Sequence, residues 1–282
     1  MRTTSRLALA LVLAAPALWA ADAARPVGIW TFDNSNESLV QDRSGGGAHG
    51  SAIGATTRGK GPWGRAIGFD GTGSHVRIPD RPQLRMTNAV TVDVWLNLPN
   101  PALGHPQCVV DKGGECYRIQ IDNDGDVMFG LKGDGKRADM GGGRLRPNIW
   151  HRITGVFQRP QMALYLDCKR VASGTWDHDI GPGGPLFFGA KSGVTYKMKG
   201  WLADVRIYNV ARPPRPTDID HLKQERAAMQ ESKLEVREAD GLMVDTGPTR
   251  ITFDPKGTGG IRSLTIGRKP LVRDNALPPL AA

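Results

Sequence analysis

The stretch GWLADVRIYNVAR, residues 200–212, alternates as a β-strand does but carries one unexplained acid, Asp204. Side chains of a strand point alternately to its two faces. The alternation predicts one face of Leu202, Asp204, Arg206 and Tyr208, and another of Trp201, Ala203, Val205 and Ile207. Asp204 then has three possible roles: a solvated carboxylate, a general acid or base, or an oxygen ligand for a cation.

Similar short strands fill the sequence before this stretch. Turn residues separate them, and Asn123-Asp124-Gly125 between YRIQID and DVMFGLK is a strong hairpin signal. The irregular spacing of short alternating runs predicts an antiparallel two-sheet sandwich, because parallel sheets need longer crossovers. The predicted strands are residues 27–32, 65–71, 75–80, 89–98, 117–122, 126–132, 150–157, 162–167, 185–190 and 201–208.

The sandwich is flanked by segments of other kinds. Residues 1–23 have basic Arg2 and Arg6, a short apolar run and a small-residue cleavage site, which together predict a cleaved signal peptide. We expect the sandwich at 24–222, a helical linker at 223–239 after the RPPRP segment, and the start of an incomplete second β domain at 240–282.

Composition and charge limit the partners. The net formal charge of +9 suits acidic partners, including acidic polysaccharides. The basic residues are scattered and accompany no nucleic-acid-binding module, so we expect no nucleic-acid partner. No later stretch is long and apolar enough to span a membrane. The sequence predicts a secreted or periplasmic protein, and leaves its oligomeric state open.

The three cysteines suggest at most one disulfide. Cys108 and Cys116 bracket a predicted hairpin turn, where opposed positions can meet disulfide geometry in an oxidising compartment. The sequence leaves open whether this bridge forms. Cys168 lies in LYLDCKRV at a predicted turn, and the spacing of the three cysteines does not favour zinc.

Five segments in order resemble the laminin-G-like, concanavalin A-like jelly-roll domains. They are IWTFD, GPWGRAIGFDGTGSHVRIPD, AVTVDVWLNL, WHRITGVF with ALYLDCKRVASG, and GWLADVRIYNVAR, and the resemblance covers residues 26–222. It implies a jelly-roll sandwich that binds glycans, proteins or lipids. Residues 240–282 are similar to the opening strands of a rhamnogalacturonan exolyase-like β-barrel domain.

The residues do not favour catalysis within the sandwich. Glycosidases need two nearby carboxylates, and no Glu-x-Asp-x-x-Glu segment occurs. A calcium loop starting at Asp122 would need Gly at position 127 and Glu at 133, where the sequence has Val127 and Gly133. We therefore predict no catalytic residues in the sandwich.

The family resemblance implies a structural calcium ion. Carried onto this sequence, its ligands are Asp33, Asp204 and the carbonyls of Gly71 and Ser74. The sequence has Ala203-Asp204 where the family has an acidic pair, which weakens the set. The alternative is an ion pair between Asp204 and Arg206.

Aromatic and polar residues in loops are the candidate ligand-binding groups. They are Trp176 with His178, and Tyr196 with Lys197. The leading hypothesis is a non-catalytic carbohydrate-binding module of an exported polysaccharide-degrading protein. The alternatives are a protein- or matrix-adhesion module, and a truncated polysaccharide lyase whose catalytic domain is missing.

Overall fold

The computed structural model describes residues 24–33, 38–114 and 116–231, and five strands between residues 235 and 272. The chain divides into two compact units, residues 1–59 with 65–213 and residues 60–64 with 214–282. The predicted signal peptide lies outside the described residues. Among the residues that are described, no helix has the length and apolar character that crossing a membrane requires.

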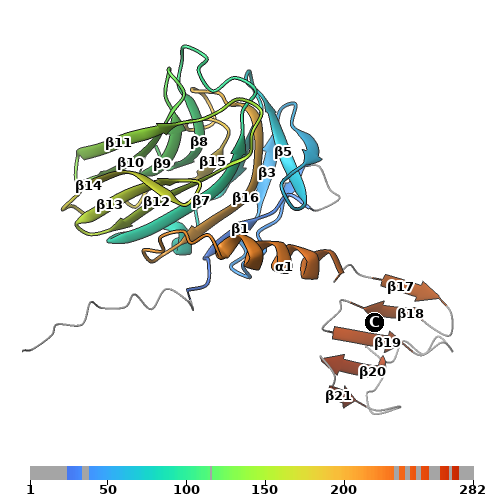
Figure 1. Ribbon diagram of the computed structural model, residues 1–282. Coiled ribbons are helices and arrows are strands. Elements are labelled where there is room, and N and C mark those ends of the chain that lie inside the picture. The colour runs from blue at the N-terminus through green and yellow to red at the C-terminus, as the bar shows by residue number, and fades with distance from the viewer. Residues whose placement is uncertain are drawn as a thin grey trace, which may run out of the picture. The chain divides into compact units, whose positions relative to one another are not determined.

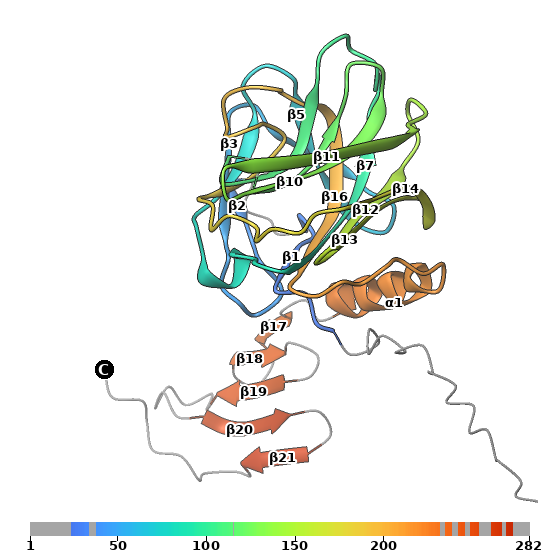
Figure 2. The ribbon, with the colours of Figure 1, turned by 90° about the vertical axis from the view of Figure 1, so that its left-hand side faces the viewer.

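The first unit consists of two antiparallel sheets packed face to face (Figures 1 and 2), which confirms the predicted sandwich. Sheet A has the order β14-β13-β12-β7-β16-β5-β4, with β1 paired to β16. Its strands are β1 (Gly28–Trp30), β4 (Thr57–Lys60), β5 (Arg65–Asp70), β7 (Ala89–Asn97), β12 (His151–Gln158), β13 (Gln161–Leu166), β14 (Lys169–Thr175) and β16 (Lys199–Tyr208).

Sheet B has the order β11-β10-β9-β8-β15-β6-β3-β2. Its strands are β2 (Leu39–Val40), β3 (Gly50–Ile53), β6 (His75–Ile78), β8 (Gln107–Lys112), β9 (Tyr117–Ile121), β10 (Asp126–Gly133), β11 (Lys136–Arg144) and β15 (Leu186–Phe188). A short 3₁₀ helix, Pro82–Leu84, follows β6. Strands β9 and β10 form the hairpin predicted at Asn123-Asp124-Gly125.

Strand β16 lies inside sheet A and not at its edge. It pairs with β7 on one side, and on the other with β5 through residues 199–202 and with β1 through residues 205–207. The first and last strands of the sandwich are therefore neighbours.

A β-bulge interrupts β16 at Asp204. Ala203 lies opposite Trp95, but the next paired residue, Arg206, lies opposite Asp93, so one residue is extra on β16. Asp204 has a φ of 46°, and a bulge of this kind reverses the faces of the strand beyond it. Leu202 is consequently in the core with Val205, which corrects the uniform alternation expected from the sequence.

The core lies between the two sheets. Trp30 is completely buried, donates a hydrogen bond from its indole nitrogen to the Ala48 carbonyl at 3.0 Å, and packs edge-on against Phe188 with ring centroids 5.2 Å apart. The alternate residues of β7 and β9, among them Val92 and Ile119, fill the same layer. This apolar layer fixes which side chains of each sheet face outward.

The second unit contains a helix and a sheet of its own. Helix α1 (Asp218–Glu231) starts after the proline-rich segment, with Asp218 and Asp220 in its first turn, where carboxylates favour the helix dipole. The predicted helical segment extended to 239; instead β17 (Glu235–Glu238) pairs in register with β18, which satisfies its backbone groups in a hairpin. The sheet has the order β17-β18-β19-β20-β21, completed by β18 (Leu242–Asp245), β19 (Thr249–Phe253), β20 (Ile261–Ile266) and β21 (Lys269–Val272).

Candidate functional site

The first predicted ligand-binding pair, Trp176 and His178, lies just after β14. Trp176 is only 5% exposed and belongs to the hydrophobic core, and His178 meets its ring edge-on with centroids 5.0 Å apart. The His178 Nε2 is 3.3 Å from the Lys136 ammonium. Trp176 thus contributes to the core and presents no flat ring face to a ligand.

The second predicted pair, Tyr196 and Lys197, lies in the loop of residues 189–198 between β15 and β16. Tyr196 is 38% exposed, and the Lys191 ammonium lies 5.1 Å from the centre of its ring. Lys197 donates a hydrogen bond to the Gly193 carbonyl at 2.6 Å. The Tyr196 carbonyl accepts a hydrogen bond from the Cys108 backbone N–H at 2.7 Å, so this loop is attached to β8. The two predicted pairs therefore lie on different segments, because Trp176 and His178 follow β14.

The four predicted calcium ligands are not at one place. Asp33 accepts a hydrogen bond from the Arg65 backbone at the start of β5, the end that neighbours Asp204. Gly71 and Ser74 belong to the turn after Asp70, at the other end of β5. Five residues of extended strand separate the two ends, roughly 17 Å. The register of β5 against β16 therefore divides the predicted ligand set.

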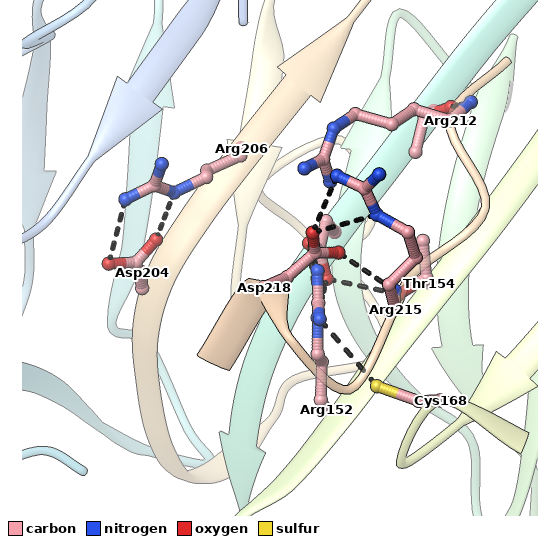
Figure 3. A network of polar contacts seen from close by, with 10 residues as sticks. Arg152, Thr154, Cys168, Asp204, Arg206, Arg212, Arg215 and Asp218 are labelled. Atoms are coloured by element: carbon pink, nitrogen blue, oxygen red, sulfur yellow. Dashed lines mark hydrogen bonds and ion pairs between the residues drawn. The ribbon is translucent and has the colours of Figure 1, made fainter. Parts of the chain in front are cut away.

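Asp204 itself forms an ion pair with Arg206 (Figure 3). Both side chains are buried, and the Arg206 guanidinium faces both carboxylate oxygens. A calcium ion there would have to lie beside this fixed positive charge. The described residues contain no group of three or more His, Cys, Asp or Glu side chains suited to a metal ion. The residues do not fit the predicted site, and calcium binding stays a prediction.

The predicted Cys108–Cys116 bridge is not formed. Strand register places Cys108 opposite Gln120, whereas Cys116 follows the β8–β9 turn and donates its backbone N–H to the Lys112 carbonyl. The two cysteines are thus displaced along the hairpin and not opposed. Cys168 lies in a turn with a φ of 65°, as expected from the sequence.

A buried ionic network occupies the outer face of sheet A, the face turned away from the core. The Asp93 carboxylate accepts hydrogen bonds from Arg152 at 2.9 and 2.5 Å and from the Thr154 hydroxyl at 3.0 Å. The same guanidinium lies 3.6 Å from the Cys168 sulfur (Figure 3). Because the Asp93 carboxylate is buried and its hydrogen bonds come from Arg152 and Thr154, this network is suited to stabilising the sheet.

The outer face of sheet B carries a polar row that the sequence did not reveal. The pairing registers align one residue from each of six adjacent strands across this face. In strand order, the row consists of Arg77, Phe187, Asp111, Arg118, Gly130 and Asp139.

Hydrogen bonds order the row. The Arg118 guanidinium donates to Gln120 at 3.0 Å and to Asp139 at 2.7 Å. Gly130 leaves space for this guanidinium, because a Cβ there would come within 2.7 Å of the Arg118 Nε. Arg118 is 3% exposed, so its guanidinium is buried and held in one position by these hydrogen bonds.

The loop of residues 189–198 is fastened to the row through Asp111. This completely buried carboxylate accepts a hydrogen bond from the Ser192 backbone at 2.8 Å and another from the Ser192 hydroxyl at 3.3 Å. The contact fastens the loop that carries the exposed Tyr196 to β8.

A shallow hollow of about 520 Å³ opens beside the row at the end of β8. Its volume falls within the range of small-molecule sites, roughly 300 to 1,000 Å³. Phe187 belongs to both the row and the hollow. The lining residues are Gly113, Gly114, Cys116, Gly183, Gly184, Pro185, Phe187 and Ser192.

The row lacks the geometry of a glycosidase. Its two carboxylates, Asp111 and Asp139, lie three strand spacings apart, roughly 14 Å. Arg118 lies in the row between them. Glycosidases place their carboxyl groups about 5–9.5 Å apart, so this pair cannot act as acid and nucleophile or base on one bond. The arrangement suits binding through hydrogen bonds and an aromatic contact.

Sequence patterns contained only a faint signal for this site. The Gly-Gly pairs at 113–114 and 183–184 indicate close backbone approach, since a Cβ on Gly113 would lie 2.0 Å from the Gly184 nitrogen. The row has no signal along the chain, because its residues come together only through strand pairing.

The comparisons agree with this fold. Domain 4 of AbnA, an extracellular arabinanase from Geobacillus stearothermophilus solved with arabinotriose, matches with a TM-score of 0.56 and 20% identity, covering 71% of this chain and 99% of that domain. The binding domain of Paraclostridial Mosquitocidal Protein 1 matches with a TM-score of 0.56 and 17% identity, covering 75% of this chain and 53% of that one. The botulinum neurotoxin serotype G binding domain matches with a TM-score of 0.58 and 12% identity, covering 86% of this chain and 61% of that one.

The chain thus spans only about half to two thirds of the two toxin domains. At these identities the likeness shows a shared jelly-roll fold. A comparison with curated proteins gives no match. The family model described as the concanavalin A-like lectin/glucanases superfamily, of laminin G type, matches residues 70–215. With its two antiparallel sheets and this match over half of its length, the chain belongs to the laminin G-type branch of the concanavalin A-like lectin/glucanase superfamily.

Proposed function

We propose that the sandwich is a non-catalytic carbohydrate-binding module that binds a glycan across the outer face of sheet B. The observation that carries the proposal is the polar row itself, six aligned residues of which Phe187 also lines a ligand-sized hollow. Sugars are recognised by fixed polar groups beside an aromatic surface. The row holds Arg118 and Asp111 in fixed positions, and the loop attached to it carries the 38% exposed Tyr196. The glycan-bound arabinanase domain, which shares the fold, is a further argument for this ligand class.

The fixed positions of the polar groups favour binding. Arg118 is held by Gln120 and Asp139, and Asp111 holds the loop that carries Tyr196. Because these groups are ordered before a ligand arrives, little conformational entropy is lost on binding. The proposal includes the setting expected from the sequence, an exported polysaccharide-degrading protein.

A glycan array with the full chain tests this function. We expect binding to at least one class of plant or bacterial polysaccharide, and Tyr196→Ala should weaken it at least tenfold. The matched control is Tyr165→Ala, which removes a half-buried tyrosine from the outer face of sheet A. Silence of the wild-type chain across neutral and acidic glycans would refute carbohydrate binding and favour the adhesion alternative. An equal loss in both tyrosine variants would place the site elsewhere.

A further inference from the structure

We infer that the hollow beside the polar row is the subsite for an uncharged sugar unit, so that the module selects neutral over uronate-containing glycans. This inference rests on the proposed function and names the class of sugar that the site accepts. It opposes the preference for acidic polysaccharides that the net charge of the chain alone would suggest.

None of the described residues that line the hollow carries a charged side chain. Four of its residues are glycines, and the other side chains are those of Pro185, Phe187, Ser192 and Cys116. Burial raises the pKa of the Cys116 thiol, which therefore stays protonated and neutral near pH 7. A uronate carboxylate placed here would find no charged partner among these lining residues.

One cation beside the lining, Lys112, is buried and already paired. The Lys112 side chain is 1% exposed, and its ammonium contacts the Asp80 carboxylate at 2.7 Å and the Gly184 carbonyl. A Cβ on Gly183 would lie 3.2 Å from the Lys112 Nζ, so the ammonium sits directly beneath the glycine loop. Its charge is therefore compensated by the Asp80 carboxylate and the Gly184 carbonyl.

The remaining groups match a neutral sugar ring. The half-buried Pro185 offers apolar surface to the C–H face of a ring, beside Phe187, which is 9% exposed. The exposed Ser192 offers a hydroxyl to the rim of the ring. The glycine loops present their backbone without side-chain cover: a Cβ on Gly114 would meet nothing within 4 Å, and one on Gly184 only the Gly113 Cα at 3.7 Å. Hydroxyls of a sugar can therefore approach backbone N–H and C=O groups closely.

Gly184 provides a steric test of the hollow. Its backbone lies outside the left-handed region, so a side chain there enters the hollow without backbone strain. The matched control is Gly73, which also lies outside that region and also has open space, in the turn after β5. We would titrate the full-length wild-type chain, Gly184→Leu and Gly73→Leu with neutral and uronate oligosaccharides of equal length, at 0.05 and 0.5 M salt.

The expected result has three parts. The wild-type chain binds a neutral oligosaccharide more tightly than its uronate counterpart, and salt changes this affinity by less than twofold. Gly184→Leu weakens binding at least tenfold, whereas Gly73→Leu leaves it unchanged. Ser192→Ala, which removes only one hydroxyl, weakens binding by a smaller factor. It tests the hollow independently if Gly184→Leu fails to fold.

Each other result identifies which statement fails. If the wild-type chain binds glycans and both Gly184→Leu and Ser192→Ala bind equally well, the hollow is not the subsite, and the proposed function survives. If binding favours the uronate and weakens strongly with salt, the neutral preference is wrong. If the wild-type chain binds none of these sugars at millimolar concentration, the proposed function fails and the subsite fails with it.

Discussion

The attachment of the 189–198 loop to sheet B should depend measurably on the charge of Asp111. The perturbation is Asp111→Asn, which keeps the shape of the side chain and removes its charge. In the structure this carboxylate accepts the Ser192 N–H at 2.8 Å and lies out of contact with water. A hydrogen bond to a charged group contributes about 1.5–3 kcal/mol and a neutral one about 0.5–1.5 kcal/mol.

The difference, about 1–1.5 kcal/mol, raises the opening equilibrium of the loop roughly five- to tenfold, since 1.4 kcal/mol corresponds to a factor of ten. Native-state hydrogen exchange of the Ser192 amide measures this opening directly.

Asp139→Asn is the control, because Asp139 lies in the same row and contacts Arg118, and not Ser192. Its exchange at Ser192 should equal that of the wild type. Unchanged Ser192 protection in a folded Asp111→Asn chain would show that the loop is held by other contacts, and the reasoning from this hydrogen bond would be wrong.

Two further predictions concern the turn after β5 and the bulge in β16. Although burial alone would raise the pKa of Asp70, hydrogen bonds from the backbone of Thr72 and Ser74 and from the Ser74 hydroxyl hold it well below its usual range. A carboxyl group with a lowered folded-state pKa stabilises the fold above its unfolded-state pKa, about 3.9, and this stabilisation is lost as pH falls further. The urea midpoint of unfolding should therefore fall less between pH 7 and 2 for Asp70→Asn than for the wild type. Parallel curves of the two proteins would contradict this. Asp204→Ala leaves the buried charge of Arg206 without this carboxylate and should destabilise the chain by about 3–5 kcal/mol, equally in calcium and in EDTA. A wild-type thermal midpoint that rises with calcium, and no longer does so in Asp204→Ala, would instead support calcium binding at Asp204.

Most of the sandwich could be predicted because its strands have strong local signals. The apolar alternation of β7 and the Asn123-Asp124-Gly125 turn between β9 and β10 each determine structure over a few residues. Strands β11 and β14 are not predicted, because Gly, Lys and Arg dominate β11 and neither sequence shows an apolar face.

The site could not be predicted from the sequence in the same way. Asp204 is displaced by a bulge, and a single extra residue leaves no mark on the alternation of apolar residues. Trp176 follows a strand end and resembles a loop residue, yet tertiary packing buries it. Asp111 and Arg118 become neighbours only through the β8–β9 register, which depends on the turn between them.

The interior position of β16 has a consequence for how the domain folds. Trp30 and Val205 are paired although they come from opposite ends of the sandwich sequence. Strands β5 and β7 also pair with β16, the last strand of the sandwich to be synthesised. Contacts this distant along the chain close slowly, because the loop entropy is lost before any pairing is gained. A ribosome-bound chain that ends before residue 208 therefore lacks the strand that joins the two halves of sheet A, and the sandwich can fold cooperatively only after its last strand has been synthesised.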